Sequence, residues 1–231
     1  MNGRLKGLGV VLVLVGFAFI AAGGYAYMKT QEGAKSLQAF STAQNVTLAY
    51  NDQGQLVDRG ETEGAVAIMG LLTNDWGYTV NSADLNPNDP LVNTGSEYMY
   101  QMATIAYHTL HGTQTVVLAE DVTADDGTVY KAGTYEFPIE GRYWSAFDRT
   151  NPIEAAAREQ AWTGTAHALI ANLGVGSVTA ATIQMGLGLA ALFALVGATI
   201  VLTGGGLVWA TRAAIEKAPA YKPATSAPMP A

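Results

Sequence analysis

The sequence predicts an α+β domain of helices and β-hairpins that is held between two transmembrane helices. Residues 7–28 and 183–210 are apolar and contain no charge, in a chain of 231 residues. A helix needs about 20 apolar residues to cross roughly 30 Å of hydrocarbon, so both stretches can span a bilayer. The segment between them, 29–182, mixes helical and strand patterns and is long enough to bury its own core.

The distribution of charge predicts the topology. Outside 29–182 the chain has five basic residues and one acidic residue, whereas the segment itself has seven basic and eighteen acidic residues. Positive charge beside a span stays cytoplasmic during insertion. We therefore expect a two-span plasma-membrane protein with an acidic extracytoplasmic domain. Its N-terminus (1–6) and its disordered, Pro-rich tail (211–231) are expected to be cytoplasmic.

A cleaved signal peptide is the alternative for residues 1–28. The basic start, the apolar run and the small residues Ala21, Ala22 and Ala26 fit such a signal. The apolar run is long for a signal peptide, which favours a retained membrane span.

Turn residues and hydrophobic periodicity predict the elements of the domain in order. A polar stalk that could be helical comes first, followed by a hairpin whose turn is Asn-Asp-Gln-Gly. A short helix with Val66, Met69 and Leu72 on one face, and Ala65 and Ile68 beside them, comes next, and then a loop. These elements cover residues 29–43, 46–59, 61–72 and 81–92, respectively.

The next helix has the clearest signals. Thr94 and Glu97 form a capping box at its start, and Gly112 is suited to the C′ position after its end. The helical spacing of Met102, Ile105, Ala106 and Thr109, with Tyr98 one turn earlier, predicts the buried face.

Residues 113–140 are expected to form strands, with turns at Asp126-Gly127 and Ala132-Gly133. After an aromatic loop (141–151), Asn151 and Pro152 begin a helix that is expected to end near Gly174. A short joint, 174–182, would then lead into the second span.

Glycines recur at the same spacing in both spans, and small residues let membrane helices approach closely. Coincidence in Gly-rich sequence is one explanation of the repeated spacing, and helix packing is the other. Because both spans are rich in Gly and Ala, we expect them to pack on a larger membrane assembly. The glycines concerned are Gly16, Gly23, Gly24, Gly197, Gly204 and Gly205.

Composition excludes several kinds of chemistry. The chain has no cysteine, which rules out thiolate catalysis, disulfides and Cys-ligated metals. The acidic domain argues against nucleic acid as a partner. His108 and His111 could share a metal with His167, but ordinary helical positions explain them better. The acidic pairs Glu120-Asp121 and Asp125-Asp126 could bind Ca²⁺, although solvated turns are the better interpretation.

Three aromatic residues, Tyr143, Trp144 and Phe147, form the candidate partner or ligand surface. They could stack on a sugar or a lipid tail, pack the domain onto the helix that follows, or contact a partner subunit.

A family resemblance is carried by two segments together with the flanking spans. The segments are YNDQGQLVDRGETEGAVAIMGLLTNDW (50–76) and NDPLVNTGSEYMYQMATIAYHTLHGTQTVVL (88–118). They resemble a family of small actinobacterial envelope proteins that is often labelled ring-opening dioxygenase. Such enzymes need an iron site of His and carboxylate ligands, which is not evident in this sequence. The chain also looks like the lipid uptake coordinator type of accessory subunit, which implies a place beside a mammalian-cell-entry (MCE) lipid transporter in the mycobacterial envelope.

The functional expectation is a non-enzymatic accessory subunit without a cofactor, whose partners are membrane lipids and a larger integral membrane complex. One alternative is an accessory subunit of a respiratory complex. Another is a ligand-binding or sensing module, with an apolar pocket between helices 97–111 and 152–173 roofed by the three aromatic residues. A metalloenzyme that uses His108 and His111 is the third.

Overall fold

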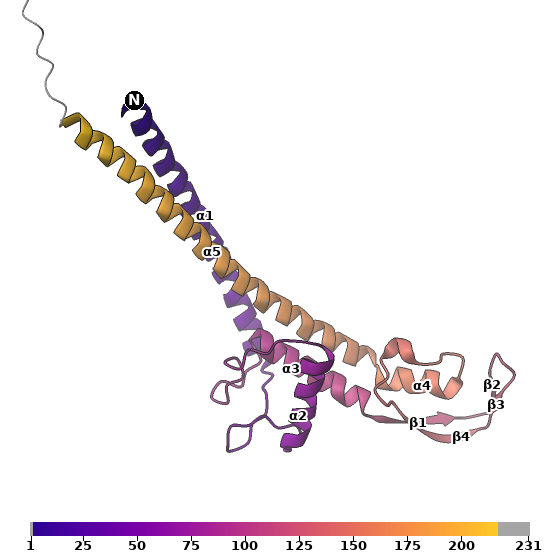
Figure 1. Cartoon of the computed structure of the whole chain (residues 1–231). Coiled ribbons are helices and arrows are strands. Elements are labelled where there is room, and N and C mark those ends of the chain that lie inside the picture. Colours follow the sequence, from indigo (N-terminus) through magenta and orange to yellow (C-terminus); the bar gives the residue numbers. More distant parts are fainter. Residues whose placement is uncertain (1, 217–231) are drawn as a thin grey trace, which may run out of the picture. The chain divides into compact units, whose positions relative to one another are not determined.

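The computed structural model describes residues 2–216 and combines helices with a small β part (Figure 1). Two of its helices are long and apolar enough to cross a membrane. The elements are α1 (Asn2–Gln44), α2 (Thr62–Gly70) continued by the π-helical turn η1 (Leu71–Asp75), α3 (Gly95–Leu110), β1 (Thr113–Leu118), β2 (Val122–Thr123), β3 (Val129–Tyr130), β4 (Gly133–Pro138), the 3₁₀ turn η2 (Trp144–Ala146), α4 (Pro152–Ala161) and α5 (Gly164–Glu216).

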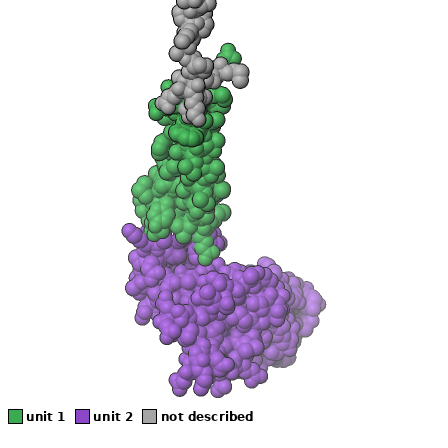
Figure 2. Space-filling view, turned by 60° about the vertical axis from the view of Figure 1, so that its left-hand side comes forward, with its two compact units in different colours: residues 1–32, 184–231 green, residues 33–183 purple. Residues whose placement is uncertain are grey.

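The chain divides into two compact units, which are coloured separately in Figure 2. Unit 1 comprises residues 1–32 and 184–231, and unit 2 comprises residues 33–183. Each expected span falls within one long helix, α1 or α5, and both helices contribute to both units. α5 continues to Glu216, so the first residues of the expected tail are helical, and the rest of that tail lies outside the described residues.

Glycines bring α1 and α5 into close contact in unit 1. A Cβ atom on Gly16 would lie 2.7 Å from the carbonyl oxygen of Gly197, and one on Gly197 would lie 2.6 Å from that of Gly16. Gly9 meets Gly204 in the same way, and Gly23 meets Ala190. These contacts recur every seven residues on both helices, the repeat that keeps a contact seam aligned in left-handed helix pairs.

The other two glycines singled out from the sequence, Gly24 and Gly205, are not in this contact. No atom outside their own helical surroundings comes within 4 Å of the position that a Cβ would take at either residue. The glycines with the shared spacing are therefore of two kinds: some contact the other helix of the α1–α5 pair, and others leave open space beside it.

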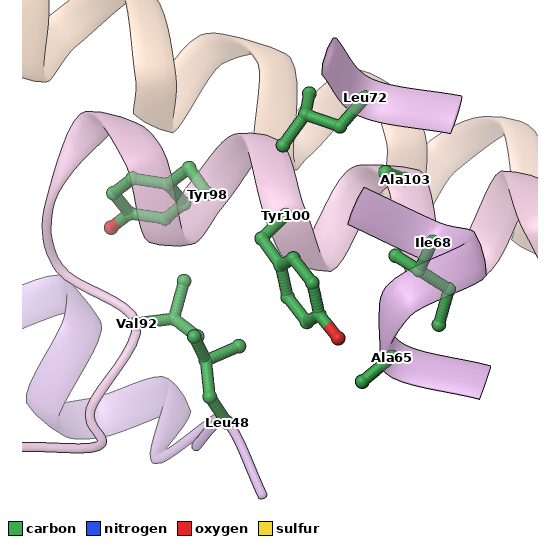
Figure 3. Close-up of a cluster of buried hydrophobic side chains, with 8 residues drawn as sticks. All are labelled: Leu48, Ala65, Ile68, Leu72, Val92, Tyr98, Tyr100 and Ala103. Atoms are coloured by element: carbon green, nitrogen blue, oxygen red, sulfur yellow. The ribbon is translucent and has the colours of Figure 1, made fainter. Parts of the chain in front are cut away.

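Unit 2 has a core of two clusters, and α3 contributes to both. The first half of α3 packs with α2, with Leu48 in the segment before α2 and with Val92 in the segment before α3, as Figure 3 shows. The second half packs with residues that follow β4 and with the end of α4. The clusters are Leu48, Ala65, Ile68, Leu72, Val92, Tyr98, Tyr100 and Ala103 in one, and Leu71, Ala106, Leu110, Ile139, Phe147, Ala161 and Trp162 in the other.

The ends of α3 follow the sequence signals, whereas its buried face differs from the prediction. Thr94 and Glu97 form the capping box, and Gly112 follows the C-cap His111. The fully buried side of the helix includes Tyr100, Ala103 and Leu110 as well as Tyr98 and Ala106. The other predicted core residues, Met102, Ile105 and Thr109, are half-buried. Met102 lies instead beside Gly174 of α5, with its Sδ atom 3.9 Å from the position of a Cβ there.

The buried face of α2 is also rotated from the pattern in the sequence. Val66 is 70% exposed, whereas Ala65, Ile68 and Leu72 are buried against α3. Residues 46–59 form the expected turn, with Asn51 N–H donating to the Gln55 carbonyl at 2.9 Å. The strand pairing around this turn is a single bridge between Tyr50 and Leu56.

The strands form one long hairpin rather than two. β1 pairs with β4 in antiparallel register, and β2 pairs with β3 towards the tip (Figure 1). Asp126-Gly127 is the turn, with Gly127 at φ +84°. Ala132-Gly133 is not a turn, because the Asp121 carboxylate accepts from Ala132 N–H at 2.9 Å and from Lys131 Nζ at 2.7 Å across the hairpin.

The predicted helix from Pro152 to near Gly174 is divided into α4 and α5. Trp162 interrupts it because its indole is buried and donates from Nε1 to the Arg142 carbonyl at 3.1 Å. Thr163 then accepts from Ala166 N–H through its hydroxyl at 3.1 Å and begins α5. The predicted joint 174–182 is also wrong, since α5 runs through it without a break.

Gly176 has a packing role in this Gly-rich part of α5. A Cβ at Gly176 would lie 2.5 Å from Cε1 of Tyr98, so the glycine is required by the approach of the Tyr98 ring. A glycine that faces a close neighbour serves packing even though it is a poor helix former.

We predict that Gly176→Ala lowers the free energy of unfolding by about 1–3 kcal/mol, the usual cost of overpacking. Gly174→Ala is the matched control, because its Cβ would be in ordinary contact at 3.9 Å and alanine favours helix by about 1 kcal/mol. Urea unfolding of the full chain in detergent, followed by Trp fluorescence, measures both. Equal stability of the two variants would contradict this role of Gly176.

Candidate functional site

A groove of about 260 Å³ in unit 2 is the candidate site. It lies among the last turns of α1, the middle of α3 and the first turns of α5, and we call it the three-helix groove. Its lining residues are Phe40, Ser41, Gln44, Val46, Val92, Tyr98, Gln101, Ile105, Leu169, Asn172 and Leu173.

A buried hydroxyl pair holds two of its walls together. Ser41 Oγ and Tyr98 OH lie 2.7 Å apart, and Ser41 also donates to the Leu37 carbonyl at 2.9 Å. Since Ser41 donates to Leu37, the Tyr98 hydroxyl is the donor between the two. Both residues are buried, at 2% and 4% exposure, so the pair is shielded from water and fixes α3 against α1.

The lining is apolar apart from this pair and three amides. Gln44, Gln101 and Asn172 come from the three different helices, and none of the lining residues is charged. Apolar walls with a few polar groups that fix orientation are typical of sites for small, largely apolar ligands. The groove can therefore take an uncharged apolar group and hydrogen-bond to one polar function.

The predicted pocket agrees with this groove in two walls and differs in the rest. Two of its walls are α3 and residues 164–173, the later part of the predicted helix 152–173, which belongs to α5. The third wall is α1. The three aromatic residues that were predicted to roof the pocket do not line the groove. A usable signal was present in the stalk, where Leu37, Phe40, Ser41 and Gln44 follow helical spacing.

The three aromatic residues pack against α4 and the first turn of α5. The Arg158 guanidinium carbon lies 4.1 Å from the centre of the Trp144 ring, a cation–π contact. Phe147 is buried beside Phe137, with the ring centres 6.4 Å apart. Trp144 and Phe147 thus have packing partners within unit 2.

Tyr143 is the member of this set that keeps a large accessible surface, at 43% exposure. Its ring stacks on Trp162 at 5.7 Å, and its hydroxyl accepts from Trp76 Nε1 at 2.8 Å. One face of the ring is thus fixed while the rest remains open to a partner.

The histidines are engaged in separate contacts. His108 Nε2 lies 2.9 Å from Asp58 Oδ1, whereas His111 and His167 each hydrogen-bond a carbonyl one turn earlier in the chain. Among the side chains that the structure describes, those of residues 3–212, no three His, Asp or Glu converge as a metal site would require. These contacts explain the histidines as structural residues.

The acidic pairs serve the hairpin. Lys131 and the Ala132 amide lower the pKa of Asp121, and Asp126 accepts from Thr128 N–H at 2.8 Å in the turn. Both carboxylates are thereby held by the chain itself, as expected for solvated turns.

Glu97 is the buried carboxylate of the domain, at 1% exposure. Its Oε2 accepts from the N–H groups of Asn93 and Thr94 at 3.0 and 2.9 Å and from the Thr94 hydroxyl at 2.9 Å. Burial raises the pKa of Glu97 more than these hydrogen bonds lower it. Nearby, burial and the charge of Asp58 raise the pKa of Tyr100 to about 12.

We predict that Glu97 makes the domain less stable as the pH rises. A carboxyl group whose pKa is higher in the folded state binds more protons when folded, so stability falls between its unfolded pKa, near 4.5, and its raised folded pKa. Glu97→Gln keeps an acceptor oxygen and removes this pH dependence. The free energy of unfolding of the variant, relative to that of the wild type, should therefore rise between pH 4 and pH 8. Thermal unfolding across that range measures the difference, with the exposed Glu120→Gln as control. A constant difference would contradict the raised pKa.

The chain matches no protein-family model, no curated protein and no solved structure.

Proposed function

We propose that this protein is a non-enzymatic accessory subunit whose two spans pack against a larger integral membrane complex. The observation that carries the proposal is the second set of glycines in unit 1. Gly24 and Gly188 have no neighbouring atom within 4 Å of a Cβ position. Both are close in sequence to the contact of Gly23 with Ala190, so they lie at similar depth along the helix pair.

Open glycines in a membrane span favour a third helix as their neighbour. Small residues allow backbones to approach closely, and close packing is the main attraction between helices in lipid. Large apolar side chains are also exposed on both helices, including Phe17 at 56% and Leu195 at 68% exposure. Phe17 is seven residues before Gly24 and Leu195 seven residues after Gly188, so each glycine shares a helix face with one of these side chains, and each face provides room for a partner span.

The charge pattern and the family resemblance support the finer parts of this proposal. We place both termini in the cytoplasm and the acidic unit 2 outside the plasma membrane, because basic flanks remain cytoplasmic. The resemblance to lipid uptake coordinators favours an MCE-type lipid transporter as the complex. A respiratory complex is the alternative, and the identity of co-purifying proteins distinguishes the two.

The test is purification of the tagged full chain from native membranes in mild detergent. We expect a complex well above the mass of one chain plus its micelle, and we expect Gly24→Leu with Gly188→Leu to release the partner. Gly7→Leu is the matched control, since it also fills open space but lies at the other end of the pair. Migration of the wild type alone would refute the proposal, and retention of the partner by the double variant would refute the packing surface.

The three-helix groove favours a second candidate function, the binding of an apolar ligand by unit 2. Its lining is uncharged and its walls come from three helices that the Tyr98 contacts hold in place. Such a module would sense or carry a molecule with a single polar group.

We predict that a photoreactive long-chain alcohol, which is uncharged, labels residues of this groove in native membranes. Leu169→Trp should reduce the labelling because Leu169 lines the groove and a larger ring fills it. Val175→Trp is the control, since Val175 is 65% exposed on the same helix and does not line the groove. Mass spectrometry of the labelled peptides gives the result, and labelling spread equally over unit 2 would exclude a specific site.

A further inference from the structure

A second groove, in unit 1, has the chemistry of a lipid site. It has a volume of about 390 Å³ and lies between the N-terminal part of α1 and the C-terminal part of α5. We propose that it binds an anionic phospholipid, with an acyl chain in the groove and the phosphate on Arg212. The lining residues are Val10, Val13, Leu14, Gly205, Val208, Trp209 and Arg212. The proposal requires that α1 and α5 cross the membrane, and it does not depend on a partner complex.

Gly205 leaves the space that an acyl chain would occupy. Its neighbour Gly204 packs against Gly9, where a Cβ would lie 2.6 Å from the Gly9 carbonyl oxygen. Gly205 itself has no atom within 4 Å of its Cβ position, although it is one of the lining residues. The close contact beside it thus sets the two helices together, and the absent side chain leaves a hollow between Val10, Leu14 and Val208.

Arg212 and Trp209 give one end of this groove the character of a membrane interface. Trp209 is 72% exposed, and Trp is enriched at the level of lipid headgroups because its ring is apolar and its N–H is polar. Arg212 is exposed one turn further along α5. A guanidinium group binds phosphate through two parallel hydrogen bonds, whereas the rest of the lining is uncharged.

The charge around this end selects an anionic headgroup. The adjoining start of α1 carries Arg4 and Lys6, which together with Arg212 outnumber the one acidic residue near this end, Glu216. A net positive end attracts anionic lipid by about 1 kcal/mol for each basic residue near the surface. A partner helix in the same place would have to bring a carboxylate to Arg212, whereas an anionic lipid supplies both the apolar chain and the negative group.

The test is native mass spectrometry of the delipidated full chain with added phosphatidylglycerol or phosphatidylcholine. We expect one tightly bound phosphatidylglycerol. Arg212→Gln should weaken it by about tenfold, towards the affinity for phosphatidylcholine, because a charge-assisted contact is lost. Gly205→Leu should weaken both lipids by filling the hollow. Gly206→Leu is the matched control, because Gly206 also has open space and does not line the groove.

Three results would overturn the proposal. Equal affinity for the two lipids would remove the headgroup selection by Arg212. Equal effects of Gly205→Leu and Gly206→Leu would show that lipid binds outside the groove. Photo-crosslinking from Val10 or Val208 to a protein in native membranes, rather than to lipid, would show that a partner helix fills it. Because these variants leave Gly24 and Gly188 unchanged, a failure here leaves the accessory-subunit proposal standing.

Discussion

Tyr98 is the residue on which the arrangement of unit 2 depends. Its hydroxyl lies 2.7 Å from Ser41 of α1, and its ring lies so close to Gly176 of α5 that a Cβ there would be 2.5 Å away. One side chain of α3 thereby fixes the parts of both long helices that belong to this unit. Other residues of α3 pack in both clusters of the core, so this helix connects the two halves of unit 2.

The three-helix groove is a consequence of these contacts. Tyr98 and Ser41 form part of its surface, and the helices that they hold together supply its other walls. Because Ser41 is small and Gly176 has no side chain, both long helices come close to α3 on either side of the buried Tyr98 ring. The lining on either side is apolar and uncharged, which suits a largely apolar ligand.

In unit 1, glycines perform two different tasks. Those at seven-residue spacing, such as Gly9 and Gly16, let α1 and α5 touch through their backbones. Others, such as Gly24 and Gly205, leave open space on the surface of the pair. In lipid, where close packing rather than hydrophobic burial drives association, such open positions provide room for a neighbour. A protein helix beside Gly24 and a lipid chain beside Gly205 are compatible, because the two glycines lie at different depths along the helix pair.

The sequence by itself determined the features that depend on local chemistry. The two apolar stretches, the Thr94–Glu97 capping box, the Asn151–Pro152 helix start and the Asp126-Gly127 turn are each specified by neighbouring residues, and all appear in the structure. The tertiary structure alone decided which side of α3 is buried, that the chain stays helical through 174–182, and which helices the stalk meets to form a groove. The reason is physical: a glycine such as Gly176 or a half-apolar helix face has the same local preferences whether it meets a ring, a helix or solvent. Its role is settled by the group that folding places opposite it.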